Sequence, residues 1–140
     1  MIVVVDSSVA AKWYAAEPDS LLARTLFRHP LAAPDLIRVE VANTLWKKIR
    51  LGQLTLDQGA SALGHLARAV TLFRAEPFAE SALELSFVLA HSVYDCFFLA
   101  IAQSLDFPLV TSDKRLWAKT RGTPFNDRVI MLQDWGGLSG

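Results

Sequence analysis

The chain opens with an uninterrupted apolar run, Ile2-Val3-Val4-Val5, which ends at Asp6. Continuous β-branched runs are typical of strands buried on both faces, as in a parallel sheet covered by helices on each side. Further short apolar runs follow at residues 31–33, 70–73, 108–111 and 129–132, and helical patterns separate them. Strands that alternate with helices predict an α/β fold, with three α/β/α layers around a short parallel sheet of about five strands.

Capping signals mark where the helices begin. Ser7 or Ser8 is expected to cap a helix that continues through residue 14, and Asp35 to cap one that continues through residue 51 and stops at Gly52. Ser92 and Asp95 have the spacing of a capping box before an almost wholly apolar helix over residues 96–105. Helical patterns also cover residues 21–27, the segment that begins with the capping box at residues 55–58, and residues 77–90 and 114–119.

Length and composition narrow the class of protein. The 140 residues are 52% hydrophobic, so we expect a single domain over residues 1–140 that buries its own core. One cysteine excludes a disulfide framework and a multi-thiolate zinc site, and it suits a reducing cytoplasm. Because no apolar span approaches 18 residues and no basic segment precedes the first apolar run, we expect no signal peptide or membrane anchor.

Two acidic residues directly follow apolar strands. Asp6 ends the first strand, and Asp113 follows the strand at residues 108–111. In an open α/β sheet, ligands bind outside the carboxyl ends of the strands, so both carboxylates are expected at that edge. Both residues also have a simpler interpretation as caps of the helices that follow them.

Two further acids are expected near the same edge. Asp95 stands in the first turn of the apolar helix, whose continuation is too hydrophobic for a surface element, although it also fits the capping box. Glu40 lies between two valines, and Asn43 shares its helix face at i+3, although a solvated helix residue would look the same. Four clustered carboxylates would raise one another's pKa unless a cation neutralised them, and oxygen ligands favour Mg²⁺ or Mn²⁺ over zinc.

With these acids in view, the sequence resembles the PIN-domain ribonucleases, and among them the VapC-type toxins of toxin–antitoxin pairs. The matching segments occur in the family's order and span nearly the whole chain; they are VVDSSV at residues 4–9, PDLIRVEVANTL at 34–45, YDCFFLAIA at 94–102 and LVTSDKRL at 109–116. The resemblance implies a PIN-like fold in which Asp6, Glu40, Asp95 and Asp113 form the acidic quartet that holds the divalent metal.

The resemblance also implies a function. Thr111 matches the family's hydroxyl residue two places before the last acid, and Asn43 matches a polar position near the site. The expected activity is that of a Mg²⁺-dependent endoribonuclease, with Mn²⁺ as a possible substitute. Metal-activated water would cleave RNA and leave a 5′-phosphate and a 3′-hydroxyl. The resemblance further implies a homodimer and a small cognate antitoxin. Asp6 and Asp95 are the first choices for direct ligands.

Two other functions fit part of the pattern. A PIN-like nuclease that processes RNA without an antitoxin would carry the same acids. A receiver-like signalling domain also places acids at strand ends, but it needs an acidic pair at the first strand and an acceptor Asp on a central strand. Here the first strand supplies only Asp6, and the central Asp57 lies within a capping box.

The remaining polar residues carry weaker signals. His29, His65 and His91 are isolated and lack zinc-site spacing, so we expect structural or surface roles for them. Lys114 and Arg115 follow Asp113 and are candidates for contacts with RNA phosphates. The 14 basic and 14 acidic residues cancel, but without the quartet 14 face 10, a charge of +4. The zero net charge therefore argues only against tight, nonspecific, charge-driven RNA binding.

Overall fold

A computed structural model describes residues 1–136 of the chain. Five parallel strands form one sheet in the order β3-β2-β1-β4-β5. Their bounds are Val3–Val5 (β1), Leu31–Pro34 (β2), Val70–Phe73 (β3), Leu109–Thr111 (β4) and Val129–Met131 (β5). The expected α/β class and the strand segments are therefore confirmed, with boundaries shifted by a residue or two.

Helices connect consecutive strands in the described residues, and one further helix follows the last strand. They are Ser7–Ala10 (α1), Ser20–Arg24 (α2), Leu36–Arg50 (α3), Leu56–Ala69 (α4), Ala79–Leu89 (α5), Val93–Leu105 (α6), Lys114–Thr120 (α7) and Leu132–Trp135 (α8), with short 3₁₀ segments at Ala11–Trp13, Thr25–Arg28 and Glu76–Phe78. The capping box of Thr55 and Gln58 forms as predicted, and Gly52 adopts the left-handed conformation, with φ +73°.

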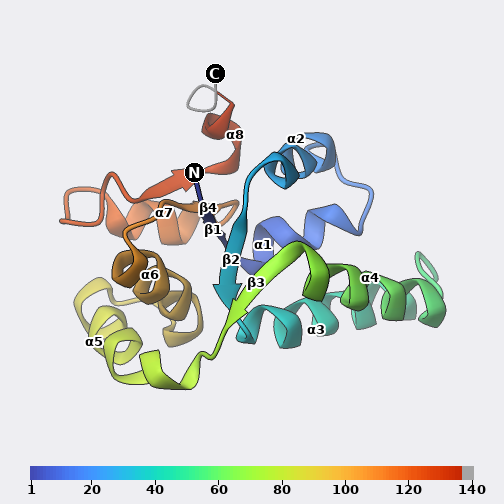
Figure 1. Cartoon of the computed structure of the whole chain (residues 1–140), viewed down its shortest axis with the longest axis horizontal. Coiled ribbons are helices and arrows are strands. Elements are labelled where there is room, and N and C mark those ends of the chain that lie inside the picture. Colours follow the sequence, from blue (N-terminus) through green and yellow to red (C-terminus); the bar gives the residue numbers. More distant parts are fainter. Residues whose placement is uncertain (137–140) are drawn as a thin grey trace.

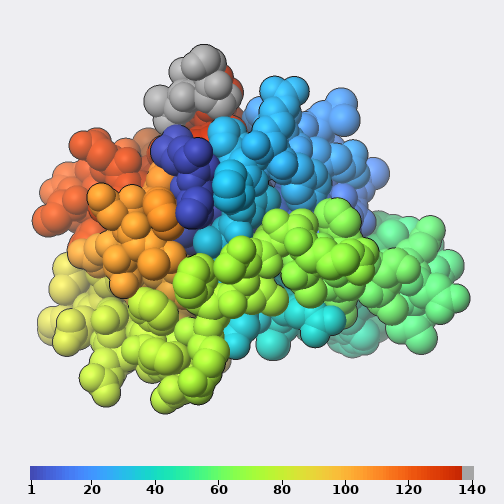
Figure 2. Space-filling view, in the orientation of Figure 1, coloured from blue at the N-terminus to red at the C-terminus, as the bar shows by residue number. Residues whose placement is uncertain are grey.

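Strand order determines which helices cover which face. The connections β1→β2 and β2→β3 step one way across the sheet, and β3→β4 and β4→β5 step the other way. Because such crossovers are right-handed, α1–α4 cover one face and α5–α7 the other. Figure 1 shows α1 and α3 on one side of β2, and α5 and α6 on the other. The dark-blue N-terminal residues in Figure 2 lie between a light-blue and an orange segment, consistent with β1 between β2 and β4.

The two directions of winding meet between β1 and β4. At such a switch point the helices diverge and leave a crevice beyond the carboxyl ends of the strands. Val5 pairs with Val110 in the register of β1 and β4, so the residues that end these two strands are neighbours. The residues in question are Asp6 and Thr111.

The core lies directly behind this edge. All three residues of β1 are fully buried, as are Phe98, Leu99 and Ile101 of α6. This confirms that the first strand is buried on both faces and that the apolar helix is central. Burial of apolar area at about 25 cal/mol per Å² makes this region the main source of folding free energy.

Within residues 1–136 no single helix is long and apolar enough to cross a membrane. Only the bent pair Glu76–Leu89 and Val93–Leu105, which meet at 112°, has the required length and composition together.

Two expected helix caps differ from the structure. Asp6, rather than Ser7 or Ser8, caps α1, and the helix predicted through residue 14 ends at Ala10 and continues as a 3₁₀ turn. Asp35 does not cap α3; its carboxylate accepts from the Ala75 N–H, which follows β3. The side chain of Asp35 bonds a tertiary donor, which the local sequence does not reveal, whereas Ser7 and Ser8 donate their hydroxyls to Glu40 and Asp6.

Candidate metal centre and adjoining groove

Asp6 lies buried where β1 turns into α1, with 4% of its surface exposed. Its Oδ1 accepts from the Ser8 hydroxyl at 2.6 Å and from the Val9 N–H at 3.2 Å. Its Oδ2 accepts from the Thr111 hydroxyl at the end of β4. The carboxylate is thus held in one orientation by donors from α1 and from the end of β4.

Burial nevertheless raises the pKa of the Asp6 carboxyl to about 6, from an ordinary value of 3.8. The hydrogen bonds from Ser8, Thr111 and Val9 lower this pKa, and the nearby Asp95 carboxylate raises it further. Since desolvation outweighs three hydrogen bonds, the ionised form of Asp6 lacks a sufficient counter-charge in the protein itself. A bound cation would supply that charge.

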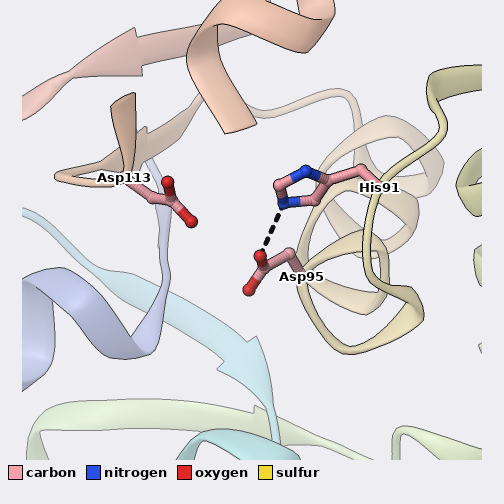
Figure 3. Close-up of side chains that lie close together, drawn as sticks. All are labelled: His91, Asp95 and Asp113. Atoms are coloured by element: carbon pink, nitrogen blue, oxygen red, sulfur yellow. Dashed lines mark hydrogen bonds and ion pairs between the residues drawn. The ribbon is translucent and has the colours of Figure 1, made fainter. Parts of the chain in front are cut away.

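Asp95, Asp113 and His91 converge on one point beyond the sheet edge (Figure 3). Asp95 comes from the first turn of α6, Asp113 from the cap of α7, and His91 from the turn between α5 and α6. One ligand atom from each lies within 4.8 Å of the others. His91 Nε2 is 2.7 Å from Asp95 Oδ2. Two acids and a histidine at this separation are compatible with ligands of one metal ion.

Electrostatic repulsion links Asp95 to the rest of the quartet. Burial raises the pKa of Asp95, the hydrogen bond from His91 lowers it, and the Asp113 carboxylate raises it. Asp95 in turn raises the pKa values of Asp6 and Glu40. Asp95 is therefore the acid through which the four predicted site residues interact, and the structure brings all four into one electrostatic cluster.

Glu40 stands on α3, across the crevice from the strand ends. Its Oε1 accepts from the Ser7 hydroxyl at 2.7 Å, a contact that ties α3 to α1. Burial raises the pKa of Glu40, the Ser7 hydrogen bond lowers it, and Asp95 raises it. A half-buried carboxyl with a raised pKa is better suited to accept a proton than an exposed one.

An open groove of about 460 Å³ runs along Glu40 beside the acidic cluster. It contains hydroxyl, amide and apolar side chains, and its lining is Ser7, Ser8, Ala11, Leu36, Val39, Glu40, Asn43, Thr44 and Tyr94. Val39 and Tyr94 are 68% and 59% exposed, so both present apolar surface to the groove. Asn43 thus shares a surface with Glu40, as their i, i+3 spacing predicts.

Asp113 combines a structural and a site role. Its Oδ1 accepts from the N–H groups of Arg115 and Leu116 at 2.9 and 3.3 Å, so it caps α7 as well as facing Asp95. Lys114 and Arg115 are exposed immediately after it. Arg121, which directly follows α7, has a structural role: it stacks on Trp117 at 4.5 Å and donates to the Asn126 carbonyl at 2.5 Å.

Ser112, which stands between Thr111 and Asp113 in the sequence, carries a buried hydroxyl without a partner among the described residues. The Ser112 backbone N–H donates to the Ser8 hydroxyl at 2.9 Å, but within residues 1–136 the Ser112 Oγ has no hydrogen-bond partner. A buried oxygen without a partner, next in the chain to Asp113, is what an oxygen-rich cation site is expected to contain. These residues fit a divalent metal ion.

Cys96 and His91 lie near Asp95 in the sequence, but only His91 contacts the acidic cluster. Cys96 follows Asp95 but is fully buried, and burial raises its pKa to about 11, so it is a small core residue. His91, for which a structural or surface role is expected, contacts the acidic cluster through Asp95. Its only signal in the sequence is its position four residues before Asp95.

Comparisons with known proteins agree with this geometry. A family model described as PIN domain matches residues 3–122. Ribonuclease VapC3 of Pyrobaculum aerophilum is 34% identical over 125 residues, which cover 85% of this chain and 95% of that protein. All four predicted quartet positions lie inside the residues that the family model matches.

Solved structures show the same fold. The crystal structure of PAE2754 from Pyrobaculum aerophilum aligns with a TM-score of 0.72 and 24% identity, covering 96% of this chain and 95% of that one. A toxin-antitoxin complex from Klebsiella pneumoniae contains a chain that aligns with a TM-score of 0.66 and 16% identity, covering 93% of this chain and 97% of that one.

Proposed function

Because this chain belongs to the PIN-domain family, with VapC ribonucleases among its relatives, we propose that it is a divalent-metal-dependent endoribonuclease acting as the toxin of a toxin–antitoxin pair. The observation that carries the proposal is the convergence of four carboxylates at the switch point of the sheet, where burial raises the pKa of three of them. Such a cluster is stable in its ionised form only with a cation bound.

Asp6, Glu40, Asp95 and Asp113 are the residues that would hold the ion. Their donors are carboxylate oxygens, which suit Mg²⁺ and Mn²⁺. When bound, such an ion lowers the pKa of a water and neutralises charge on the scissile phosphate. Thr111 and Ser8 support the site by holding both oxygens of Asp6 in place.

Glu40 is the residue we assign to the attacking water. It lines the groove, the Ser7 hydroxyl fixes its orientation, and its pKa is raised by burial and by Asp95. A carboxylate with these properties can accept the proton that the water loses as it attacks phosphorus. The attack in line with the leaving oxygen would give a 5′-phosphate and a 3′-hydroxyl.

The groove supports a single-stranded or looped RNA substrate. Exposed Tyr94 and Val39 offer apolar contacts to unstacked bases, and Asn43 offers an amide for hydrogen bonding. Lys114 and Arg115, exposed beside Asp113, are assigned to the phosphates on either side of the cleaved bond. A substrate that carries its own negative charges requires that the quartet be neutralised first, as the bound ion would do.

The activity is tested with purified protein and a defined RNA. We expect cleavage in Mg²⁺ or Mn²⁺, none in EDTA, and a loss of at least about 1,000-fold in kcat/KM for Asp95→Asn, equivalent to about 4 kcal/mol of transition-state stabilisation. Asp134→Asn, which removes an exposed acid near the end of α8, serves as the matched control. Cleavage of a circular RNA identifies an endonuclease. Full activity in EDTA or in Asp95→Asn would refute the proposed mechanism.

The toxin assignment has its own test. The similarity to a chain of a toxin-antitoxin complex and to a protein named VapC supports a small cognate antitoxin. We further propose that each chain is a single nuclease domain and that two chains form a homodimer in the cytoplasm. Expression should arrest growth, and co-expression of a short neighbouring gene product should relieve the arrest. Harmless expression of an active enzyme would instead favour an RNA-processing nuclease without an antitoxin.

A further inference from the structure

The proposed metal centre includes one donor that is not an oxygen. We propose that Nε2 of His91 is a ligand of the ion that Asp95 and Asp113 hold, and that this nitrogen makes the centre bind Mn²⁺ in preference to Mg²⁺. The inference rests on the proposed function because it concerns the same centre. It goes beyond that function by assigning a fifth ligand residue and a metal preference.

The distances support ligation. His91 Nε2 lies 2.7 Å from Asp95 Oδ2, and the ligand atoms of His91, Asp95 and Asp113 are all within 4.8 Å of one another. Donors at about 2.1 Å from an octahedral ion are separated by about 3 Å when adjacent and about 4 Å when opposite. The 2.7 Å separation is close to the value for adjacent donors, and the 4.8 Å limit exceeds the value for opposite donors by less than about 1 Å, so small side-chain movements would bring all three donors onto one ion.

The fold holds His91 in this position. Ala90 ends α5 in the left-handed conformation, with φ +50°, and the His91 N–H then donates to the Ser86 carbonyl at 3.2 Å. Ser92 caps α6 directly afterwards. The turn points the imidazole toward Asp95, as Figure 3 shows, and leaves 9% of its side chain exposed. A side chain so restricted is preorganised as a ligand.

Ligand chemistry determines the metal preference. Mg²⁺ favours oxygen donors and retained waters, whereas imidazole binds first-row transition ions more strongly. Mn²⁺ accepts both carboxylate oxygen and imidazole nitrogen, so a centre with both donor types favours it. If His91 only donated a hydrogen bond to Asp95, its Nε2 would carry a proton and could not bind the ion. Detection of nitrogen coordination therefore distinguishes two roles of His91: a ligand of the ion, or a residue that only positions Asp95.

The experiment uses the full chain and Mn²⁺ itself. Pulsed EPR of the Mn²⁺ complex is recorded with natural and ¹⁵N-labelled histidine, and calorimetry gives the affinities for Mn²⁺ and Mg²⁺. His91→Gln removes the imidazole, and His91→Asp replaces it with an oxygen donor. His29→Gln is the matched control, because it removes a histidine that is not part of the acidic cluster. His29 packs against Trp135, with ring centroids 5.4 Å apart. Circular dichroism establishes that each variant is folded.

We expect a nitrogen coupling in the wild-type complex that changes with the ¹⁵N label. It should disappear in both His91 variants and persist in His29→Gln. His91→Gln should weaken Mn²⁺ binding about 10- to 100-fold and Mg²⁺ binding much less. Should one His91 variant fail to fold, the other decides the result.

Two results would overturn the assignment. Mn²⁺ binding without a nitrogen coupling in the wild type, or a coupling that persists without His91, refutes ligation by His91 and leaves the nuclease proposal intact. A chain that binds no divalent ion and cleaves no RNA refutes both proposals.

Discussion

β1 and the residue that ends it are both buried, but they contribute to the molecule in opposite ways. Val5 is fully buried among apolar side chains, and Asp6, one residue later, is 4% exposed among hydroxyl and amide donors. Burial of Val5 stabilises the fold, because apolar surface leaves water. Burial of Asp6 raises its pKa to about 6, because the charged form loses hydration that three hydrogen bonds do not replace.

The difference distinguishes residues that stabilise the fold from residues that form the candidate metal site. The interior of the sheet and α6 supply folding free energy, whereas the carboxyl edge holds mutually repelling acids at a cost in stability. Such an edge is favourable only once a cation is bound. A substitution that shortens a core side chain should therefore lower the stability of the metal-free protein. A substitution that removes an acid from the carboxyl edge should raise it.

The largest effect on stability is expected in the interior. Ile101→Ala removes a fully buried side chain from α6 and should lower the free energy of unfolding by about 2–5 kcal/mol. Leu83→Ala on α5, where the side chain is 64% exposed, should change it by less than about 0.5 kcal/mol. Urea denaturation of the metal-free protein measures both. Equal effects would mean that α6 is not the central helix of the core.

A pH series tests the acidic edge. Because the folded state raises the pKa of Asp6 from 3.8 to about 6, the protonated carboxyl contributes stability that is complete below 3.8 and lost as the pH rises through about 6. Asp6→Asn stays neutral throughout. Its stability relative to the metal-free wild type should therefore increase by about 2–3 kcal/mol between about pH 4 and pH 7. A difference that is constant across this range would show that burial does not disfavour the Asp6 charge.

The smallest effect is expected at the exposed cations. Lys114→Ala should weaken RNA binding by about 1 kcal/mol and reduce the slope of log K against log salt by about one, because one phosphate contact is lost. Arg28→Ala removes an exposed cation just before β2, at the opposite end of the strands, and should leave the slope unchanged. Filter binding at several salt concentrations measures both. Equal slopes for Lys114→Ala and the wild type would remove this residue from the RNA-binding surface.

The comparison also shows what the sequence can predict. Asp6 and Asp113 could be assigned to one edge because each follows an apolar run, and parallel strands place their carboxyl ends together. The apolar helix behind Asp95 and the i, i+3 pair of Glu40 and Asn43 favoured a place near the same edge, and the resemblance joined all four acids in one centre. Their convergence depends on how α3 and α6 pack across the sheet, which periodicity alone does not specify.

His91 and Asp35 illustrate why the rest could not be predicted. The position of His91 depends on a left-handed Ala90, an unusual conformation for a residue with a Cβ atom. Asp35 looked like a helix cap but accepts a hydrogen bond from Ala75, 40 residues away. The partner of Asp35 is supplied by tertiary structure, and the contact between His91 and Asp95, four residues apart, depends on a turn conformation that the sequence pattern does not indicate.

Thermal unfolding of the wild type and Asp6→Asn at pH 7, with and without Mn²⁺, tests the central claim most directly. We predict that the variant is the more stable protein without the ion, and that Mn²⁺ at 100 times its Kd stabilises the wild type by about 2.7 kcal/mol and the variant far less. The account would be contradicted if Mn²⁺ left the wild type unchanged or stabilised both proteins equally.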